Sequence, residues 1–76
     1  MGWVIAEFPE TREILVDDKP QGPNRWPNGE YRTIIIDDGD HTFRLGPPPD
    51  GTPAAQKLVV EKTSVLAPLH VVFTKV

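Results

Sequence analysis

Apolar residues along this chain recur at every second position or in short runs that are rich in Val and Ile. A spacing of two is typical of β-strands, whose successive side chains point to opposite faces, and no window has the period of an amphipathic helix. Clusters of Pro, Gly and Asp separate the runs and predict turns. We therefore predict an all-β chain in which no helix is longer than one turn.

The spacing predicts about six to seven short strands, an arrangement typical of a β-sandwich or a small barrel. Three consecutive isoleucines at 34–36 indicate a strand that is covered on both faces or lies in the middle of a sheet. Longer connections are expected at 23–29 and 46–53, and Val65 or Leu66 is expected to lie under the sheet. The apolar runs cover residues 3–8, 12–17, 31–36, 41–45, 56–62 and 69–76.

An Asp-Gly pair separates the third run from the fourth. Such a pair between alternating strands favours a two-residue type I′ turn, because both central residues of that turn have positive φ. We therefore predict that Asp38 and Gly39 form the tip of a hairpin that joins the strand at 34–36 to the strand at 41–45.

The chain length leaves room for one domain over residues 1–76, with a single thin core. There is no cysteine, so apolar packing rather than disulfides or thiolate-bound metal must stabilise the fold. The expected core consists of Ile14, Val16, Ile34, Ile36, Phe43, Leu45, Leu58, Val60, Val71 and Phe73.

The charge pattern restricts the classes of partner. The net charge is −3 and the basic residues are scattered, so no nucleic-acid partner is expected. No apolar run approaches the ~20 residues of a membrane-spanning helix, and the first residues lack the basic start of a signal peptide. We expect a monomer that does not insert into a membrane. Its location is cytoplasmic by default, or envelope-associated if a leader has been removed.

Two short motifs resemble those of PEGA domains. Residues 16–22, VDDKPQG, are similar to the family's V-D-G-K-x-x-G turn, and residues 39–45, GDHTFRL, are similar to its Gly-x-His strand. The resemblance covers residues 7–76. Asp18 stands where the family usually has Gly, and Asp tolerates the left-handed backbone that the turn requires. Pro23-Asn24 replaces the family's Thr-Pro, and its Gly-Tyr after the histidine strand is missing.

The resemblance implies an all-β fold, a small immunoglobulin-like or transthyretin-like antiparallel β-sandwich. It also implies a non-catalytic accessory role, often at the cell envelope, in contact with protein or carbohydrate. The motif residues of the family are mostly turn and core positions, so the resemblance supplies no binding residues.

The residues needed for catalysis are not grouped in the sequence. His41 and His70 are the only imidazoles, and nothing places Ser64 near either of them. We interpret His41 as a histidine at the core edge that anchors a turn, and His70 as an exposed side chain. We therefore expect no enzyme, no catalytic residue and no cofactor.

Two acidic turns could suggest a cation site. Asp37, Asp38 and Asp40 surround Gly39, but the 12-residue calcium loop that ends in a bidentate Glu is absent. A solvated turn is the better interpretation, and no metal is expected. Asp17 and Asp18 form the second acidic turn.

The candidate binding residues are Trp26, in a loop between two prolines, and the residues that flank it, Asn24, Arg25 and Asn28. An aromatic ring beside amide and guanidinium groups is suited to stacking on a sugar ring or burying into a partner protein. Alternatively, Trp26 folds back over the open end of a small core. Trp3 has the same two interpretations, in a run expected to be an edge strand.

The proline run at 47–49 is interpreted as a stiff connector rather than as a recognised polyproline segment. The sequence thus predicts a non-enzymatic β-sandwich module whose loops contact a protein or a glycan. The alternative is a structural or assembly domain that pairs through a sheet edge.

Overall fold

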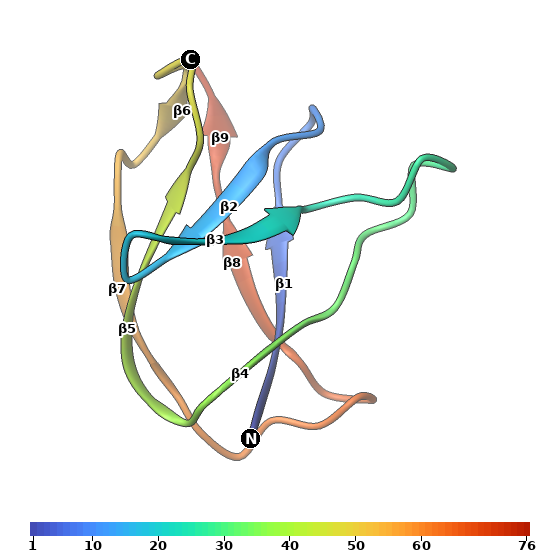
Figure 1. Cartoon of the computed structure of the whole chain (residues 1–76), viewed down its shortest axis with the longest axis vertical. Helices are drawn as coiled ribbons and strands as arrows, with labels where there is room; N and C mark the ends of the chain where they lie inside the picture. The colour runs from blue at the N-terminus through green and yellow to red at the C-terminus, as the bar shows by residue number, and fades with distance from the viewer.

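The computed structural model describes all 76 residues, which form β-strands, turns and loops without a helix (Figure 1). The all-β prediction is therefore confirmed. The strands outnumber the expected six to seven, because β3 and β6 form where turns or connections were predicted and the last run divides into β8 and β9. The strands are β1 (Gly2–Glu7), β2 (Glu13–Val16), β3 (Lys19–Pro23), β4 (Ile34–Ile36), β5 (Gly39–Leu45), β6 (Gly51–Thr52), β7 (Gln56–Val60), β8 (Leu69–Val72) and β9 (Thr74–Lys75).

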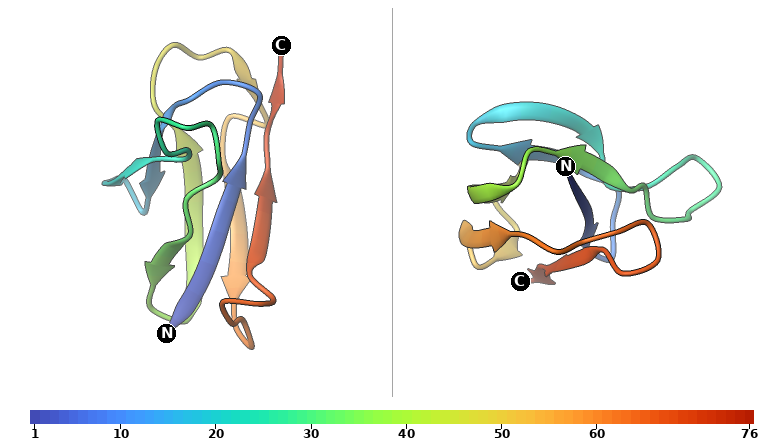
Figure 2. Two further views of the ribbon diagram at one scale, coloured as in Figure 1. Left: turned by 90° about the vertical axis from the view of Figure 1, so that its right-hand side faces the viewer. Right: turned by 90° about the horizontal axis from the view of Figure 1, so that it is seen from below.

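Two larger sheets face each other across one core (Figures 1 and 2). The three-stranded sheet has the order β4-β1-β8, and the four-stranded sheet has the order β3-β2-β5-β7. A short sheet, β6-β9, lies near the C-terminus. β1 and β8 pair in parallel, so the expectation of a purely antiparallel arrangement is wrong. Two parallel strands must be joined by a long connection, and here it runs from the end of β1 at Glu7 to the start of β8 at Leu69.

The core consists of ten buried apolar residues from both sheets. Every residue predicted for the core belongs to this cluster or, like Ile36, Leu45 and Leu58, packs against it. The sequence-based core omits the buried residues of the first run, because that run is expected at a sheet edge and β1 is instead the middle strand of its sheet. The cluster comprises Val4, Ala6, Phe8, Ile14, Val16, Ile34, Phe43, Val60, Val71 and Phe73.

β4 departs from the prediction in two ways. It is an edge strand that pairs only with β1, and Ile35 is 55% exposed, so the strand is not covered on both faces. β5 pairs with β2 and β7 rather than with β4, so Asp38 and Gly39 do not form a hairpin tip. They lie instead where the chain crosses from one sheet to the other. Gly39 still has a positive φ of 125°.

The tight hairpin of the fold lies at Asp17 and Asp18. Val16 pairs with Lys19, so these two residues form the turn, with φ of 53° and 64°. Positive φ at both positions is the signature of a type I′ turn, for which Asp is among the tolerated residues. The expectation that Asp18 preserves the turn in place of Gly is therefore confirmed.

Two loops project from the same side of the domain. Figure 2 shows that residues 24–31 and the connection between β7 and β8 both stand out beside the three-stranded sheet. Val65 and Leu66, in the second of these loops, are 67% and 93% exposed, so the expectation that one of them lies under the sheet is wrong. The proline run connects β5 to β6, and Asp50 N–H donates to the Pro48 carbonyl as the chain turns into β6.

Candidate contact site around Trp26

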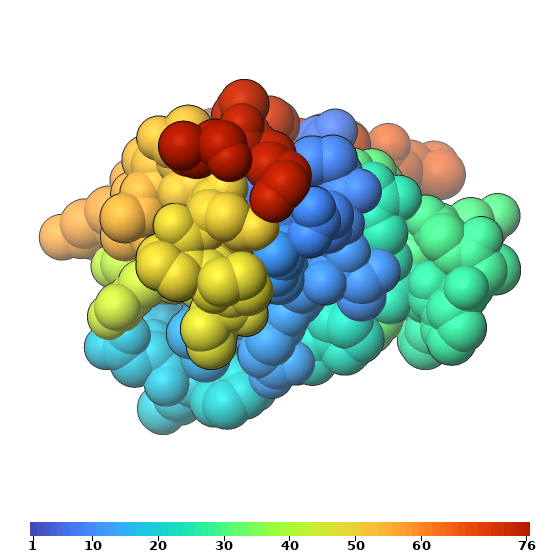
Figure 3. Space-filling view, turned by 90° about the horizontal axis from the view of Figure 1, so that it is seen from above, coloured from blue at the N-terminus to red at the C-terminus, as the bar shows by residue number.

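Residues 24–31, here called the Trp26 loop, form a compact turn that projects from the body of the domain (Figures 1 and 3). Arg25 and Tyr31 form an isolated antiparallel bridge at its base. At its tip, Gly29 N–H donates to the Trp26 carbonyl over 2.9 Å. The Trp-Pro-Asn-Gly sequence suits such a turn, with Pro at the second position and Gly at the fourth. This signal could have predicted the turn inside the long connection.

Asn24 is buried and serves the fold rather than the surface. Its side chain is 0% exposed. Oδ1 accepts the Arg12 backbone N–H at 2.8 Å, and Nδ2 donates to the Glu10 carbonyl at 3.2 Å. Its backbone carbonyl also accepts the Arg32 N–H at 2.8 Å. The amide therefore ties the loop to the chain before β2, and it is not available to a ligand.

Arg25 is also occupied within the chain. Its Nη1 donates to the Gly29 carbonyl at 2.7 Å, and its Nη2 donates to the Phe8 carbonyl and the Tyr31 hydroxyl at 2.9 Å each. The guanidinium carbon lies 4.1 Å from the centroid of the Tyr31 ring, within the range of a cation–π contact. Arg25 therefore holds the loop in its conformation.

Trp26 is exposed. The residue has 54% of its surface exposed to solvent, which contradicts the alternative that Trp26 folds back over the core. The backbone is held in place because Trp26 N–H donates to the Glu30 carbonyl at 2.8 Å. The guanidinium carbon of Arg32 lies 5.4 Å from the ring centroid. Arg32 Nη1 itself donates to the carbonyls of Gln21 and Pro23.

The structure thus separates the four candidate residues. Trp26 and Asn28 lie at the surface, while Asn24 and Arg25 support the loop from within. Asn28 Oδ1 accepts the Glu30 backbone N–H at 3.0 Å, which stabilises the turn. The sequence did not indicate Arg32, because it lies outside the loop and reaches Trp26 only in the folded chain.

His41 anchors the β2–β3 turn, as predicted. Nδ1 lies 2.6 Å from Asp17 Oδ2, and Nε2 lies 2.7 Å from the Asp37 carbonyl. A neutral imidazole can donate only one of these bonds, so two acceptors favour the charged ring. The bond to Asp17, and then the Asp37 carbonyl, raise the pKa of His41 above its usual value. The ring also meets Phe43 edge-on, with centroids 6.4 Å apart.

A shallow groove of about 380 Å³ lies beside this histidine, between the β2–β3 hairpin and β4. Its lining mixes both signs of charge with apolar side chains, and its acidic Asp17 is already bonded to His41. The lining residues are Val16, Asp17, Lys19, Gln21, Ile35, Ile36, Asp37 and His41.

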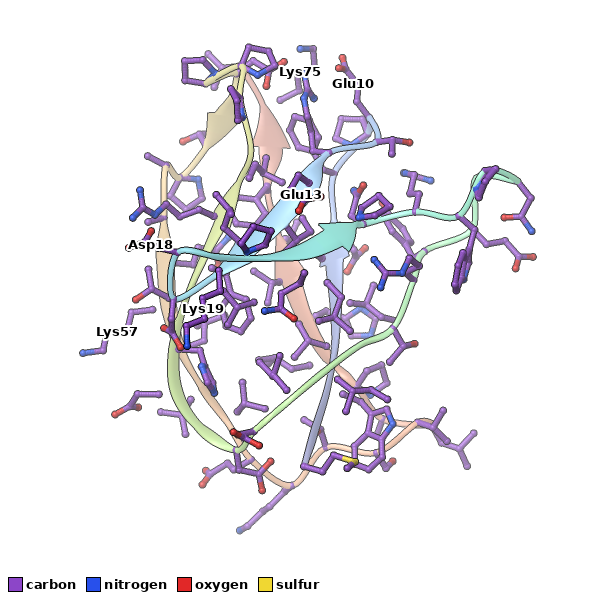
Figure 4. The ribbon with its side chains drawn as sticks, in the orientation of Figure 1. Glu10, Glu13, Asp18, Lys19, Lys57 and Lys75 are labelled. Atoms are coloured by element: carbon purple, nitrogen blue, oxygen red, sulfur yellow. The ribbon has the colours of Figure 1, made fainter.

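Charged side chains elsewhere pair within the chain. Lys75 Nζ lies 2.6 Å from Asp50 Oδ2 and 3.2 Å from Glu10 Oε2, and Figure 4 shows Glu10 and Lys75 at the same end of the domain. The bond from Lys75 lowers the pKa of Asp50, and its two acidic partners raise the pKa of Lys75. Arg12 Nη2 joins the same cluster through Asp50. His70 Nδ1 lies 2.9 Å from Glu7 Oε2, and the His70 side chain is exposed, as predicted.

The structure contains no group of three or more His, Cys, Asp or Glu side chains placed to hold a metal ion. It also contains no helix of the length and apolar character needed to cross a bilayer.

Comparisons with known proteins do not place the chain in a family. No protein-family model matches it, and no curated protein or solved structure is significantly similar to it.

Proposed function

We propose that this protein is a non-enzymatic contact module that binds a partner protein through the Trp26 loop. The observation that carries the proposal is an exposed indole on a loop whose backbone is fixed by internal hydrogen bonds. A large aromatic side chain held in one conformation loses little entropy on binding, and Trp is enriched among the residues that dominate binding energies.

A protein is favoured over a glycan by the polar groups around the indole. Sugar recognition combines an aromatic platform with several polar side chains that point to the hydroxyls. Asn24 is buried here, the Nη1 and Nη2 groups of Arg25 donate within the chain and its Nε is buried, so the loop offers mainly the ring itself. An apolar pocket on a protein suits such a ring better.

The alternative of assembly through a sheet edge has less support. Arg32 Nη1 covers the carbonyls of Gln21 and Pro23 in β3, and Gln56 Nε2 donates to the Val72 carbonyl in β8. Side chains thus occupy acceptors on two of the edge strands that an added strand would need.

We further propose that the fold is an immunoglobulin-like or transthyretin-like sandwich of the PEGA type. Two observations support this proposal. Asp17 and Asp18 adopt the left-handed turn expected of the first motif, and His41 of the second motif bonds to that turn.

The proposal is tested by affinity capture with the wild-type chain, Trp26→Ala and a control, Lys57→Ala, whose exposed side chain lies on the four-stranded sheet. We expect a protein that the wild type and the control retain and that Trp26→Ala loses. The same three proteins are applied to a glycan array. Capture that is equal for all three, or Trp26-dependent binding to a glycan instead, would contradict the proposal.

A further inference from the structure

The outer face of the three-stranded sheet carries more apolar side chains than a solvated sheet face usually does. Val4 and Ala6 are fully buried, so the alternate residues of β1 point away from the core. Their cross-strand partners in β4 and β8 share that direction. This outer face comprises Trp3, Ile5, Glu7, Ile35, His70 and Val72.

The corresponding face of the four-stranded sheet is more polar, although it also carries Leu15 and the exposed Val59. In β5 the residues that alternate with buried Phe43 are Asp40, Thr42 and Arg44, and Lys57 of β7 pairs with Thr42 and points outward (Figure 4). A sheet with one solvated face normally shows this alternation of apolar and polar residues. The three-stranded sheet is apolar on both faces, which is typical of a sheet that is covered on both sides.

The apolar side chains of the outer face are accessible in the single chain. Ile35 and Val72 are 55% and 54% exposed, and Trp3 and Ile5 are half-buried. Figure 2 shows the face between two projecting loops, one of them the loop after β7, which contains the exposed Leu66. Apolar side chains gathered on one accessible face are typical of an interaction site.

We propose that the outer face docks against the same face of a second copy of this chain. The argument is its charge pattern. Glu7 and His70 are its only ionisable residues, and they lie side by side, with Glu7 Oε2 2.9 Å from His70 Nδ1. A two-fold axis through this pair places Glu7 of one copy beside His70 of the other, so the carboxylate of each copy can accept a hydrogen bond from the imidazole of its partner, and the face is complementary to itself in polar contacts as well as in apolar character.

A standard interface takes about 800 Å² from each partner, which is about a sixth of the 4663 Å² surface of this chain. The dimer replaces the monomer expected from the sequence. It goes beyond the Trp26-dependent contact, because it depends on the sheet face and not on the tip of the Trp26 loop.

Matched valines allow a sharp test. Val72 on the outer face and Val59 on the four-stranded sheet are both strand residues, 54% and 53% exposed. Sedimentation velocity on the full chain, from about 1 μM to about 1 mM, gives the dimer dissociation constant. We expect Val72→Glu, and independently Ile35→Glu, to raise it at least about tenfold, since a charge buried against an apolar partner surface stays desolvated and unpaired. We expect Val59→Glu to leave it within about twofold.

The charge pair gives a second test. Glu7→Lys should raise the dissociation constant by removing the carboxylate that His70 of the other copy would bond across the two-fold axis, and adding His70→Glu to the same chain should restore it by supplying a carboxylate for the new Lys. A wild-type chain that stays monomeric to about 1 mM would overturn the proposal. Equal increases in the dissociation constant for Val59→Glu and Val72→Glu would also overturn it. So would a dissociation constant that Glu7→Lys leaves unchanged. Trp26→Ala should lose partner capture but keep the wild-type dimer dissociation constant. Partner capture therefore tests the proposed function, and the dissociation constant tests the dimer.

Discussion

Asp17 and His41 form a salt bridge that joins the β2–β3 turn to β5. Their Oδ2 and Nδ1 atoms lie 2.6 Å apart, and the other carboxylate oxygen of Asp17 accepts the Thr42 backbone N–H at 2.9 Å. His41 also bonds to the Asp37 carbonyl. This one side chain of β5 therefore connects its strand both to the β2–β3 turn and to the crossover that follows β4. The turn at residues 17–18 and the strand at residues 39–45 are therefore parts of one local structure.

This salt bridge makes stability depend on pH in a defined direction. The pKa of His41 is raised above 6.5, so its contribution is complete below pH 6.5 and is lost as the pH rises through the folded-state value. The Thr42 N–H, and then His41, lower the pKa of Asp17 below 3.8, so its contribution is complete above pH 3.8 and is lost as the pH falls through the lowered value.

We therefore expect the thermal midpoint to be highest near about pH 5 and to fall towards about pH 9. His41→Gln should lower the midpoint at pH 5 and flatten this fall. His70→Gln is the control, because the exposed pair of His70 with Glu7 contributes little to stability. Melts by circular dichroism across this range test the assignment, which is wrong if His41→Gln keeps the wild-type pH profile.

Asp18 is constrained by its backbone. Its φ of 64° suits Gly and is tolerated by Asp, whereas a β-branched residue resists it. We expect Asp18→Gly to change the free energy of unfolding by no more than about 0.5 kcal/mol, and Asp18→Val to lower it by about 1–3 kcal/mol.

Asp40→Val provides the matched control for this turn. Asp40 is also an exposed acid, but it lies in β5, where Val is favourable, so the change should stay within about 0.5 kcal/mol. Urea denaturation of the three variants gives the comparison. Equal midpoints for Asp18→Val and Asp40→Val would show that residue 18 does not need the left-handed backbone.

The alternating runs were sufficient to predict the fold class and most of the core. The burial of Phe43 could be predicted because apolar and polar residues alternate cleanly around it in the sequence. Strand pairing depends on long-range contacts instead. Nothing near Ile35 shows that its strand pairs with β1, which is why the hairpin at Gly39 and the burial of all three isoleucines were predicted wrongly.

The candidate site was predicted only in part for a similar reason. The composition of the loop indicated an aromatic ring with polar neighbours at the surface, and Trp26 and Asn28 are both exposed. The direction of each side chain depends on partners far along the chain. Asn24 finds Arg12, and Arg25 finds Phe8, so both turn inward.

Asn24→Ala should therefore affect folding rather than binding directly. The change removes two hydrogen bonds and leaves the Arg12 N–H and the Glu10 carbonyl without their side-chain partner. We expect a loss of about 2–3 kcal/mol in the free energy of unfolding. Asn28→Ala, at an exposed position in the same loop, should cost less than about 1 kcal/mol. Chemical denaturation of both variants measures the difference, and equal losses would contradict the buried role of Asn24.

The most direct test of the account is the free energy of unfolding of Trp26→Ala, measured by urea denaturation and followed by circular dichroism. Trp26 is exposed on a loop that Arg25 and the backbone hold in place, so its side chain is available to a partner and is not needed by the core. The account predicts a change of less than about 1 kcal/mol. A loss of about 3 kcal/mol or more, the cost of truncating a buried aromatic residue, would show that Trp26 belongs to the core and would contradict its role as a contact residue.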